Sequence, residues 1–193
     1  MSATTPIFLL SGGPAVGKST TAGALAARFA RGVHIPVDAL RDMVVSGQVL
    51  PGADWSPQLV EQLVVARRCA VYAAMAWREA GFAVVIDDFW DPHSELAEYA
   101  ALTSQPQTYR VLLYPGRDAA RARNMKRSGP GGASDYIDDG IRLVYEHLDA
   151  VVGALAAQGW WVLDTSEQTV EDVVSDIVTL LGQSVRRSER GVS

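Results

Sequence analysis

Short runs of consecutive apolar residues alternate along this chain with longer segments of helical periodicity. Each run is bounded by turn-forming or charged residues, as expected of buried strands, and the predicted strands cover residues 6–10, 33–37, 82–86, 109–114 and 160–164. Between them, apolar residues recur three and four positions apart, which predicts helices over residues 20–31, 39–46, 58–80, 93–102, 116–127, 134–158 and 170–181. This alternation predicts an α/β fold of three layers, with a mostly parallel sheet covered by helices on both faces.

The segment between the first predicted strand and the first predicted helix carries the clearest chemistry. It matches G-x-x-x-x-G-K-[ST], with Gly12 and Gly17 as the fixed glycines and Lys18-Ser19 at the end. Glycines let the backbone N–H groups surround a nucleotide β-phosphate, and the following helix adds free amides and the positive end of its dipole. Lys18 supplies a mobile charge for the phosphates, and the Ser19 hydroxyl supplies a Mg²⁺ ligand. The predicted nucleotide-binding residues are Gly12, Gly13, Pro14, Ala15, Val16, Gly17, Lys18, Ser19 and Thr20.

Composition and charge narrow the possible functions. The 193 residues are 48% hydrophobic and 20% charged, which predicts one domain over residues 1–182 and a flexible polar tail over residues 183–193. The net charge of −5 argues against binding of long nucleic acids. Cys69 is the only cysteine, so no internal disulfide is possible, and its apolar neighbours predict a buried thiol. No apolar run reaches the roughly 18 residues that span a membrane, and no secretory signal is evident, so we expect a cytoplasmic protein. The oligomeric state stays open.

Carboxylates follow the predicted strands at the edge of the sheet where ligands bind. Asp87 and Asp88 come directly after the run over residues 82–86, which is the Walker B arrangement. Asp87 is expected to hold Mg²⁺ together with Ser19, directly or through a water molecule. Asp88 is a second candidate ligand, and a helix cap or turn is its alternative role. Because parallel strands end at one edge, we expect one cleft to collect the residues Ser11, Asp38, Asp87, Asp88 and Asp164.

Asp38 is the candidate general base. Transfer of a phosphoryl group to an alcohol needs an acceptor for the hydroxyl proton near the attacking oxygen. An aspartate at the end of the second strand can face the γ-phosphate across the cleft. Arg41 follows one helical turn later on the same face and could hold an anionic or hydrogen-bonding group. The alternative is that Asp38 caps the helix predicted to begin at Ala39.

The predicted helix over residues 116–127 is basic, and a glycine-rich loop follows it. Such a unit could close over the triphosphate as a lid, with arginines that stabilise charge on the transferring group. Arg123 and Arg127 share one face and are the preferred catalytic pair, and Arg121 is a candidate nucleotide contact. The alternative is a solvated basic helix. Trp55 and Trp90 are candidate walls of an acceptor pocket, with core packing as their alternative, and the three histidines are assigned no role.

Together these motifs resemble the P-loop kinases with a nucleoside-monophosphate-kinase-like core. The likeness is strongest to chloramphenicol phosphotransferase and its relatives, and more distant to the zeta-toxin, gluconate-kinase and polynucleotide-kinase groups. It covers residues 6–182 and rests on the phosphate loop, Val37-Asp38 with Arg41, residues 85–88, the arginine-bearing lid and residues 163–166. The resemblance implies the P-loop NTPase fold with strand order 2-3-1-4-5, ATP as donor and Asp38 as general base. It also implies that Thr165 and the residues up to Gln168 lie near the adenine.

These expectations favour an ATP- and Mg²⁺-dependent kinase that phosphorylates a hydroxyl of a small molecule, with antibiotics and other natural products as candidates. A kinase for the 5′-hydroxyl of a polynucleotide or nucleotide is the alternative within the same chemistry. A nucleotide-dependent switch without an acceptor is the alternative from another class. The N-K-x-D motif with which many GTPase switches read guanine does not occur in the chain.

Overall fold

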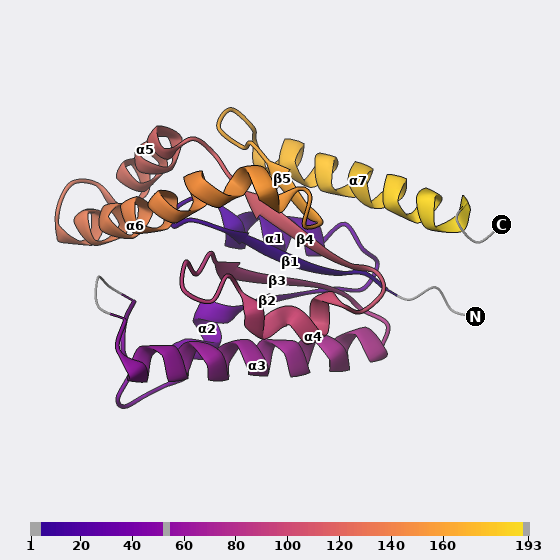
Figure 1. Cartoon of the computed structure of the whole chain (residues 1–193), viewed down its shortest axis with the longest axis horizontal. Helices are drawn as coiled ribbons and strands as arrows, with labels where there is room; N and C mark the ends of the chain where they lie inside the picture. Colours follow the sequence, from indigo (N-terminus) through magenta and orange to yellow (C-terminus); the bar gives the residue numbers. More distant parts are fainter. Residues whose placement is uncertain (1–4, 52–54, 191–193) are drawn as a thin grey trace.

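Five parallel strands form one sheet in the order β2-β3-β1-β4-β5. The computed structural model describes residues 5–51 and 55–190, and Figure 1 shows the arrangement of the elements. The strands are β1 (Ile7–Gly12), β2 (Gly32–Pro36), β3 (Ala83–Phe89), β4 (Thr108–Leu113) and β5 (Trp160–Leu163). The predicted α/β class, the parallel sheet and the strand order are all confirmed.

Helices cover both faces of this sheet. They are α1 (Lys18–Ala26), α2 (Val37–Arg41), α3 (Pro57–Glu79), the 3₁₀ turn η1 (Ala97–Tyr99), α4 (Ala100–Thr103), α5 (Arg117–Ser128), α6 (Gly132–Leu155) and α7 (Val170–Arg190). Figure 1 shows α3 and α4 on one side of the strands and α7 on the other, and two separate apolar clusters match these sides. Helix α6 contributes to both clusters, through Leu148 to the α3 side and through Ile141 to the α7 side.

The central strand shows why its sequence is apolar without interruption. Ile7 and Leu9 lie in the cluster with α3, whereas Phe8 and Leu10 lie in the cluster with α1 and α7. Alternate side chains of a strand point to opposite faces, so a strand covered on both faces must be apolar at every position. The polar Ser11 comes where β1 approaches the edge at which the phosphate loop begins.

Several predicted boundaries are wrong. Strand β3 runs on to Phe89, so Asp87 and Asp88 lie in the strand rather than after it. The helix predicted over residues 93–102 begins only at Ala97, because Glu95 and Leu96 have φ values of 47° and 63° that no α-helix allows. The helix predicted over residues 39–46 instead covers Val37–Arg41.

The end of the chain also differs from the prediction. Helix α7 continues to Arg190, so residues 183–190, expected to be a flexible tail, are helical. Residues 191–193 of that predicted tail lie outside the described part of the chain. Cys69 is exposed rather than buried. None of the helices in the described residues combines the length and apolar character needed to cross a membrane.

Candidate active site

The phosphate loop connects β1 to α1 and is shaped by its glycines. Gly12 has a φ of 155°, and a Cβ there would lie 2.5 Å from the carbonyl oxygen of Leu113. Gly17 adopts the left-handed conformation, with a φ of 93°, directly before α1. No side chain caps α1 and no acidic residue lies in its first turn, so its first N–H groups are available to an anion. The loop therefore has the form of a phosphate cradle.

Lys18 lies in this loop with its ammonium directed at the backbone. Its Nζ donates a hydrogen bond of 2.8 Å to the carbonyl of Gly13. Burial lowers the pKa of Lys18, while the nearby carboxylates of Asp38, Asp87 and Asp88 act in the opposite direction. The structure therefore brings three of the carboxylates singled out in the sequence within electrostatic reach of the phosphate-loop lysine.

The two adjacent aspartates of β3 have different surroundings. Asp87 is buried, and its Oδ1 lies 3.2 Å from Nε2 of His34 on the neighbouring strand β2. Asp88 accepts hydrogen bonds from Nε of Arg67 at 2.7 Å, from the hydroxyl of Tyr99 at 3.1 Å and from the N–H of Phe89 at 2.9 Å. Burial raises the pKa of Asp88 to about 6, although Arg67 and Tyr99 favour its ionised form. Asp88 is thus held by protein donors at both carboxylate oxygens.

A metal ion in this cleft would depend on few protein ligands. Within the described residues, no three His, Cys, Asp or Glu side chains are grouped as in a cage made wholly by protein. Mg²⁺ fits this arrangement, because it keeps several water molecules and takes one or two carboxylates together with phosphate oxygens. Ser19 in the first turn of α1 and Asp87, two residues before the end of β3, carry the oxygen atoms that such a site would use.

Asp38 lies within α2, next to Arg41. The residue before this helix is Pro36, and Asp38 belongs to the first turn, so the alternative role of Asp38 as a helix cap is wrong. Nη1 of Arg41 lies 3.2 Å from Oδ1 of Asp38, and Nη2 donates to the carbonyl of Val49 at 3.3 Å. The Arg41 side chain is 6% exposed, whereas that of Asp38 is 73% exposed. A buried guanidinium therefore orients a carboxylate that remains open to solvent.

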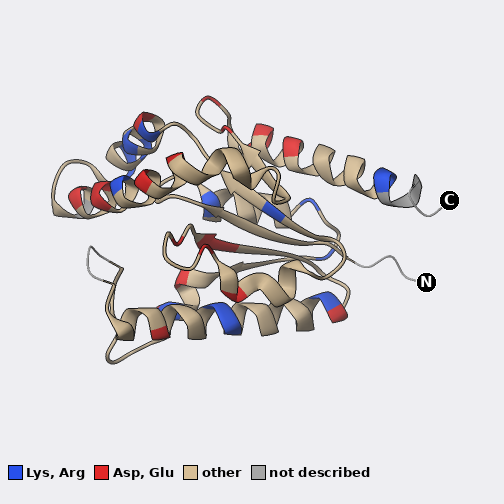
Figure 2. Cartoon of the chain, in the orientation of Figure 1, with Lys and Arg blue, Asp and Glu red and all other residues tan. Residues whose placement is uncertain are grey.

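The basic helix α5 packs against α6, and Figure 2 shows its Lys and Arg residues gathered beside the acidic α6. Asn124 joins the two helices, because its side-chain amide donates to the Ser134 carbonyl at 2.9 Å and to Asp138 at 2.7 Å. Arg121 and Arg127 are exposed, and the charge of Arg127 acts on Lys18. Both arginine side chains are therefore open to solvent, and Arg127 is near enough to Lys18 for its charge to lower the pKa of the lysine.

Arg123 has a different position from its predicted partner Arg127. Its guanidinium donates to the carbonyls of Val16 and Thr165, which belong to the phosphate loop and to the segment after β5. A cavity of about 280 Å³ lies beside these contacts, lined by Val16, Gly17, Thr20, Thr21, Leu113, Arg123, Thr165, Gln168, Thr169, Val170 and Val173. The Thr165 hydroxyl and Oε1 of Gln168 are buried there with no hydrogen-bond partner among the described residues. This cavity suits a flat polar ring next to the phosphate loop.

An aromatic wall is formed by rings from the segment before α3, from the end of β3 and from the segment after it. It consists of Trp55, Phe89 and His93, and we call it the acceptor wall. The ring centres of Trp55 and His93 are 4.3 Å apart, and those of Trp55 and Phe89 are 6.2 Å apart. Trp90, the other predicted wall residue, is 1% exposed and packs on Trp160, so its core alternative is the one observed. Residues 52–54 of the loop before this wall lie outside the described residues.

Sequence reasoning missed three side chains of this region. Arg67 lies on the buried face of α3 between Leu63 and Ala70, and a charged residue on an apolar face is the signal that could have identified it. His34 contacts Asp87, and its place two residues before the end of an edge strand gives a weaker signal. His93 gives none, because its position depends on the irregular segment before η1.

A family model described as "Chloramphenicol phosphotransferase-like protein" matches residues 5–181. This protein is a member of that family. The resemblance inferred from the motifs is thereby confirmed, and family membership supports a phosphotransferase that acts on a small molecule. No curated protein matches the chain.

Solved structures of the same fold include three that align over nearly the whole chain. A sugar kinase from Janibacter sp. HTCC2649 is 18% identical, with a TM-score of 0.66 and coverage of 92% of this chain and 95% of that one. A gluconokinase from Sinorhizobium meliloti 1021 is 16% identical, with a TM-score of 0.66 and coverage of 98% and 99%. A tunicamycin resistance protein from Deinococcus radiodurans is 17% identical, with a TM-score of 0.64 and coverage of 92% and 96%. At these identities the likeness establishes the fold.

Proposed function

We propose that this protein is a kinase that uses ATP and Mg²⁺ to phosphorylate a hydroxyl group of a small molecule. The observation that carries the proposal is the exposed carboxylate of Asp38, which is held by the buried Arg41 and lies within electrostatic reach of Lys18. A nucleotide switch without an acceptor would need no such oriented and exposed carboxylate near its phosphate-loop lysine. Family membership supports the same reaction class.

The donor nucleotide is assigned to the phosphate loop and the cavity beside Arg123. ATP supplies the phosphoryl group when bound. The free amides of α1 and the ammonium of Lys18 bind phosphate oxygens, and Ser19 with Asp87 holds Mg²⁺. His34 orients the Asp87 carboxylate through its contact with Oδ1. We assign Asp88 a secondary place in metal binding, because its oxygens already accept three hydrogen bonds from the protein.

The acceptor is assigned to the space between Asp38 and the acceptor wall. Asp38 accepts the proton of the attacking hydroxyl at one carboxylate oxygen, while Arg41 holds the other. The wall provides apolar aromatic surface, which suits an acceptor with an apolar or unsaturated face, and antibiotics and other natural products include such alcohols. Arg127 and Arg121 of the lid stabilise negative charge on the phosphates. Arg123 instead lines the cavity that is assigned to the nucleotide base.

The experiment is transfer of labelled γ-phosphate from ATP into a panel of hydroxylated antibiotics, nucleosides, sugars and short 5′-hydroxyl oligonucleotides. Wild type is compared with Asp38→Asn and with Asp42→Asn, an exposed aspartate one turn later that serves as the matched control. We expect Asp38→Asn to slow transfer by about 100-fold or more, since loss of a general base has this effect. Asp42→Asn should remain within about 2-fold, as surface substitutions usually do.

Three outcomes distinguish the alternatives. Transfer to one small molecule that depends on Asp38 supports the proposal. Labelled oligonucleotide, with affinity that falls steeply with salt, would favour the polynucleotide kinase instead. Slow release of phosphate at equal rates in wild type and Asp38→Asn would contradict a kinase mechanism and favour the switch.

A further inference from the structure

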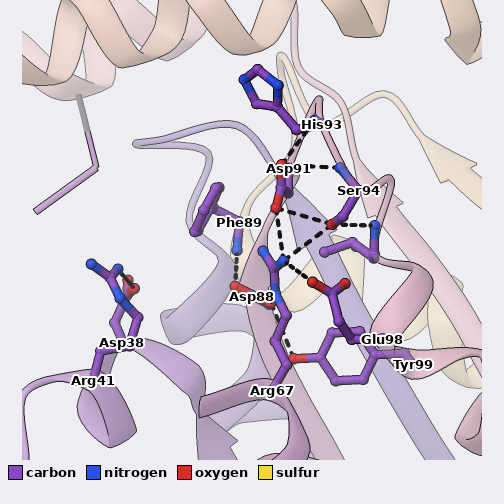
Figure 3. A network of polar contacts seen from close by, with 11 residues as sticks. Asp38, Arg41, Arg67, Asp88, Phe89, Asp91, His93, Ser94, Glu98 and Tyr99 are labelled. Atoms are coloured by element: carbon purple, nitrogen blue, oxygen red, sulfur yellow. Dashed lines mark hydrogen bonds and ion pairs between the residues drawn. The ribbon is translucent and has the colours of Figure 1, made fainter. Parts of the chain in front are cut away.

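Arg67 is a fully buried charge in the middle of α3. Its exposed fraction is 0%. Nε lies 2.7 Å from Oδ2 of Asp88, and Nη1 lies 2.7 Å from Oδ2 of Asp91 and 2.9 Å from Oε1 of Glu98. Figure 3 shows these three carboxylates arranged around the guanidinium. Because a buried charge without partners costs several kcal/mol, this arrangement is stable only with its acceptors in place.

The carboxylates that bind Arg67 all belong to residues 88–98, which lead from the end of β3 into η1. Within this segment, Asp91 accepts hydrogen bonds from the backbone N–H of His93 at 2.8 Å and from the Ser94 hydroxyl at 3.0 Å. Glu95 and Leu96 have positive φ values, so regular secondary structure does not hold the backbone there. The contacts with Arg67 therefore fasten an irregular segment to a regular helix.

This same segment carries most of the acceptor wall. Phe89 follows Asp88 directly, and His93 follows Asp91 by two residues. The Arg67 Cζ lies 5.4 Å from the centre of the Phe89 ring. In Figure 3, Phe89 lies between the Arg67 network and the pair of Asp38 and Arg41. The guanidinium is thus placed behind the wall and is shielded from the cleft.

We propose that Arg67 is the positioning residue of the acceptor wall. Its guanidinium holds residues 88–98 against α3, and so fixes where Phe89 and His93 meet Trp55. The role in acceptor binding rests on the proposed function, whereas the effect on the wall does not. Arg67 itself does not touch the acceptor, because its side chain is completely buried. A purely structural Arg67 would affect stability and leave the wall unchanged.

Two variants of the network and one control test the proposal. Arg67→Lys keeps the positive charge but replaces a planar fork by a compact ammonium, which cannot span Asp88, Asp91 and Glu98 together. Glu98→Gln removes one of the three carboxylates, and its milder change decides the question if Arg67→Lys does not fold. Arg68→Lys is the matched control, because Arg68 is the exposed neighbour on the same helix.

The first measurement reports on the wall without any substrate. The protein is labelled with 5-fluorotryptophan, and the ¹⁹F resonance of Trp55 is assigned with Trp55→Phe. We expect Arg67→Lys and, more weakly, Glu98→Gln to shift or broaden the Trp55 resonance while those of Trp77 and Trp161 stay in place. Arg68→Lys should change none of the three. An unchanged Trp55 resonance in folded Arg67→Lys, or in Glu98→Gln if the former does not fold, would overturn the proposal.

The second measurement uses the panel compound that accepts phosphate from the wild type. We expect Arg67→Lys to raise KM for this acceptor by about 10-fold, with kcat and KM for ATP within about 3-fold, because uniform binding is lost rather than transition-state binding. A fall in kcat together with a rise in KM for ATP would contradict a role confined to the wall. If no compound accepts phosphate, the proposed function fails, and the fluorine spectra still decide the role of Arg67.

Discussion

The proposed nucleotide side and the proposed acceptor side of the site are built from different groups. On the nucleotide side, backbone groups dominate: the glycines of the phosphate loop, the free amides at the start of α1, and the carbonyls that receive Arg123. On the acceptor side, side chains dominate, with Arg41 holding Asp38 and Arg67 holding the segment behind the acceptor wall. The first side is assembled mainly from one short stretch of chain, and the second from residues that are far apart in the sequence.

In the proposed function, this difference separates donor binding from the choice of acceptor. The phosphate cradle needs only a glycine-bounded turn before a helix, so the same motif suits any kinase that uses the same donor. The acceptor wall depends on a network in which Arg67 reaches partners 21 to 31 positions later in the chain. Substitutions in such a network can reshape one side of the cleft while the other stays intact. Five predictions test whether the two sides are separable in this way.

The largest effect is expected from Lys18→Ala on the nucleotide side. The variant removes the mobile charge of the phosphate loop, and loss of such a group costs about 100- to 1,000-fold in rate. We expect affinity for a non-hydrolysable ATP analogue, measured by calorimetry, to fall together with phosphate transfer. The Trp55 resonance should not move, because the acceptor wall is held by other residues. Undiminished affinity for the analogue would contradict the assignment of the phosphate loop itself.

Asp91→Asn should weaken the acceptor side and leave the nucleotide side intact. Loss of one partner from a buried ion pair costs about 3 kcal/mol of unfolding free energy, which chemical denaturation measures. Burial alone would raise the pKa of Asp91, but the hydrogen bonds from Arg67 and the His93 N–H lower it below its ordinary value. The stabilisation is therefore present above the unfolded pKa and is lost as the pH falls through the folded one. The difference between wild type and Asp91→Asn should shrink on acidification below about pH 4.

At Asp88, the pH dependence of the unfolding free energy should have the opposite sign to that at Asp91. Because burial raises its pKa to about 6, the folded state binds this proton more tightly than the unfolded state does. The stability contributed by the protonated carboxyl is complete below the unfolded pKa and is lost as the pH rises through about 6. As the pH rises through about 6, the unfolding free energy of the wild type should therefore fall relative to that of Asp88→Asn. Equal pH dependence of the two variants would show that the carboxylates do not have separate surroundings.

The difference between the nucleotide side and the acceptor side also explains which features could be predicted from the sequence. The alternation of strands and helices and the phosphate loop follow from local patterns of a few residues, and these were predicted, whereas the strand order was implied only by the resemblance to a known family. The positive φ values of Glu95 and Leu96 have no local signal, because neither residue is glycine or asparagine. The Arg67 network follows from how α3 packs beside β3, and periodicity shows only that Arg67 lies on the buried face. Tertiary contacts of this kind are beyond single-sequence reasoning.

On the nucleotide side, Gln168 should influence the choice of base. Its Nε2 donates to Asp176 at 2.7 Å, which leaves Oε1 as a buried acceptor without a partner among the described residues. An adenine amino group would satisfy this oxygen, whereas a guanine carbonyl would not. We expect Gln168→Leu to reduce the preference for ATP over GTP by about 10-fold, as the loss of one buried hydrogen bond predicts. Competition binding of the two nucleotides measures this ratio, and an unchanged ratio would contradict the placement of the base.

The smallest effect is expected at Tyr136, where the two sides meet. The Tyr136 hydroxyl, on α6 beside the lid, donates to the carbonyl of Pro51 in the loop that follows α2. Burial raises the pKa of Tyr136, and the charges of Arg41 and Asp38 act on it as well, so this contact lies near the candidate base. Tyr136→Phe removes one exposed hydrogen bond and keeps the ring, so we expect KM for the acceptor to rise by about 3-fold. Since the contact joins α6, which packs against α5, to the loop that follows α2, KM for ATP should rise slightly in the same variant. A change in only one of the two constants would show that closure over the nucleotide and closure over the acceptor are independent.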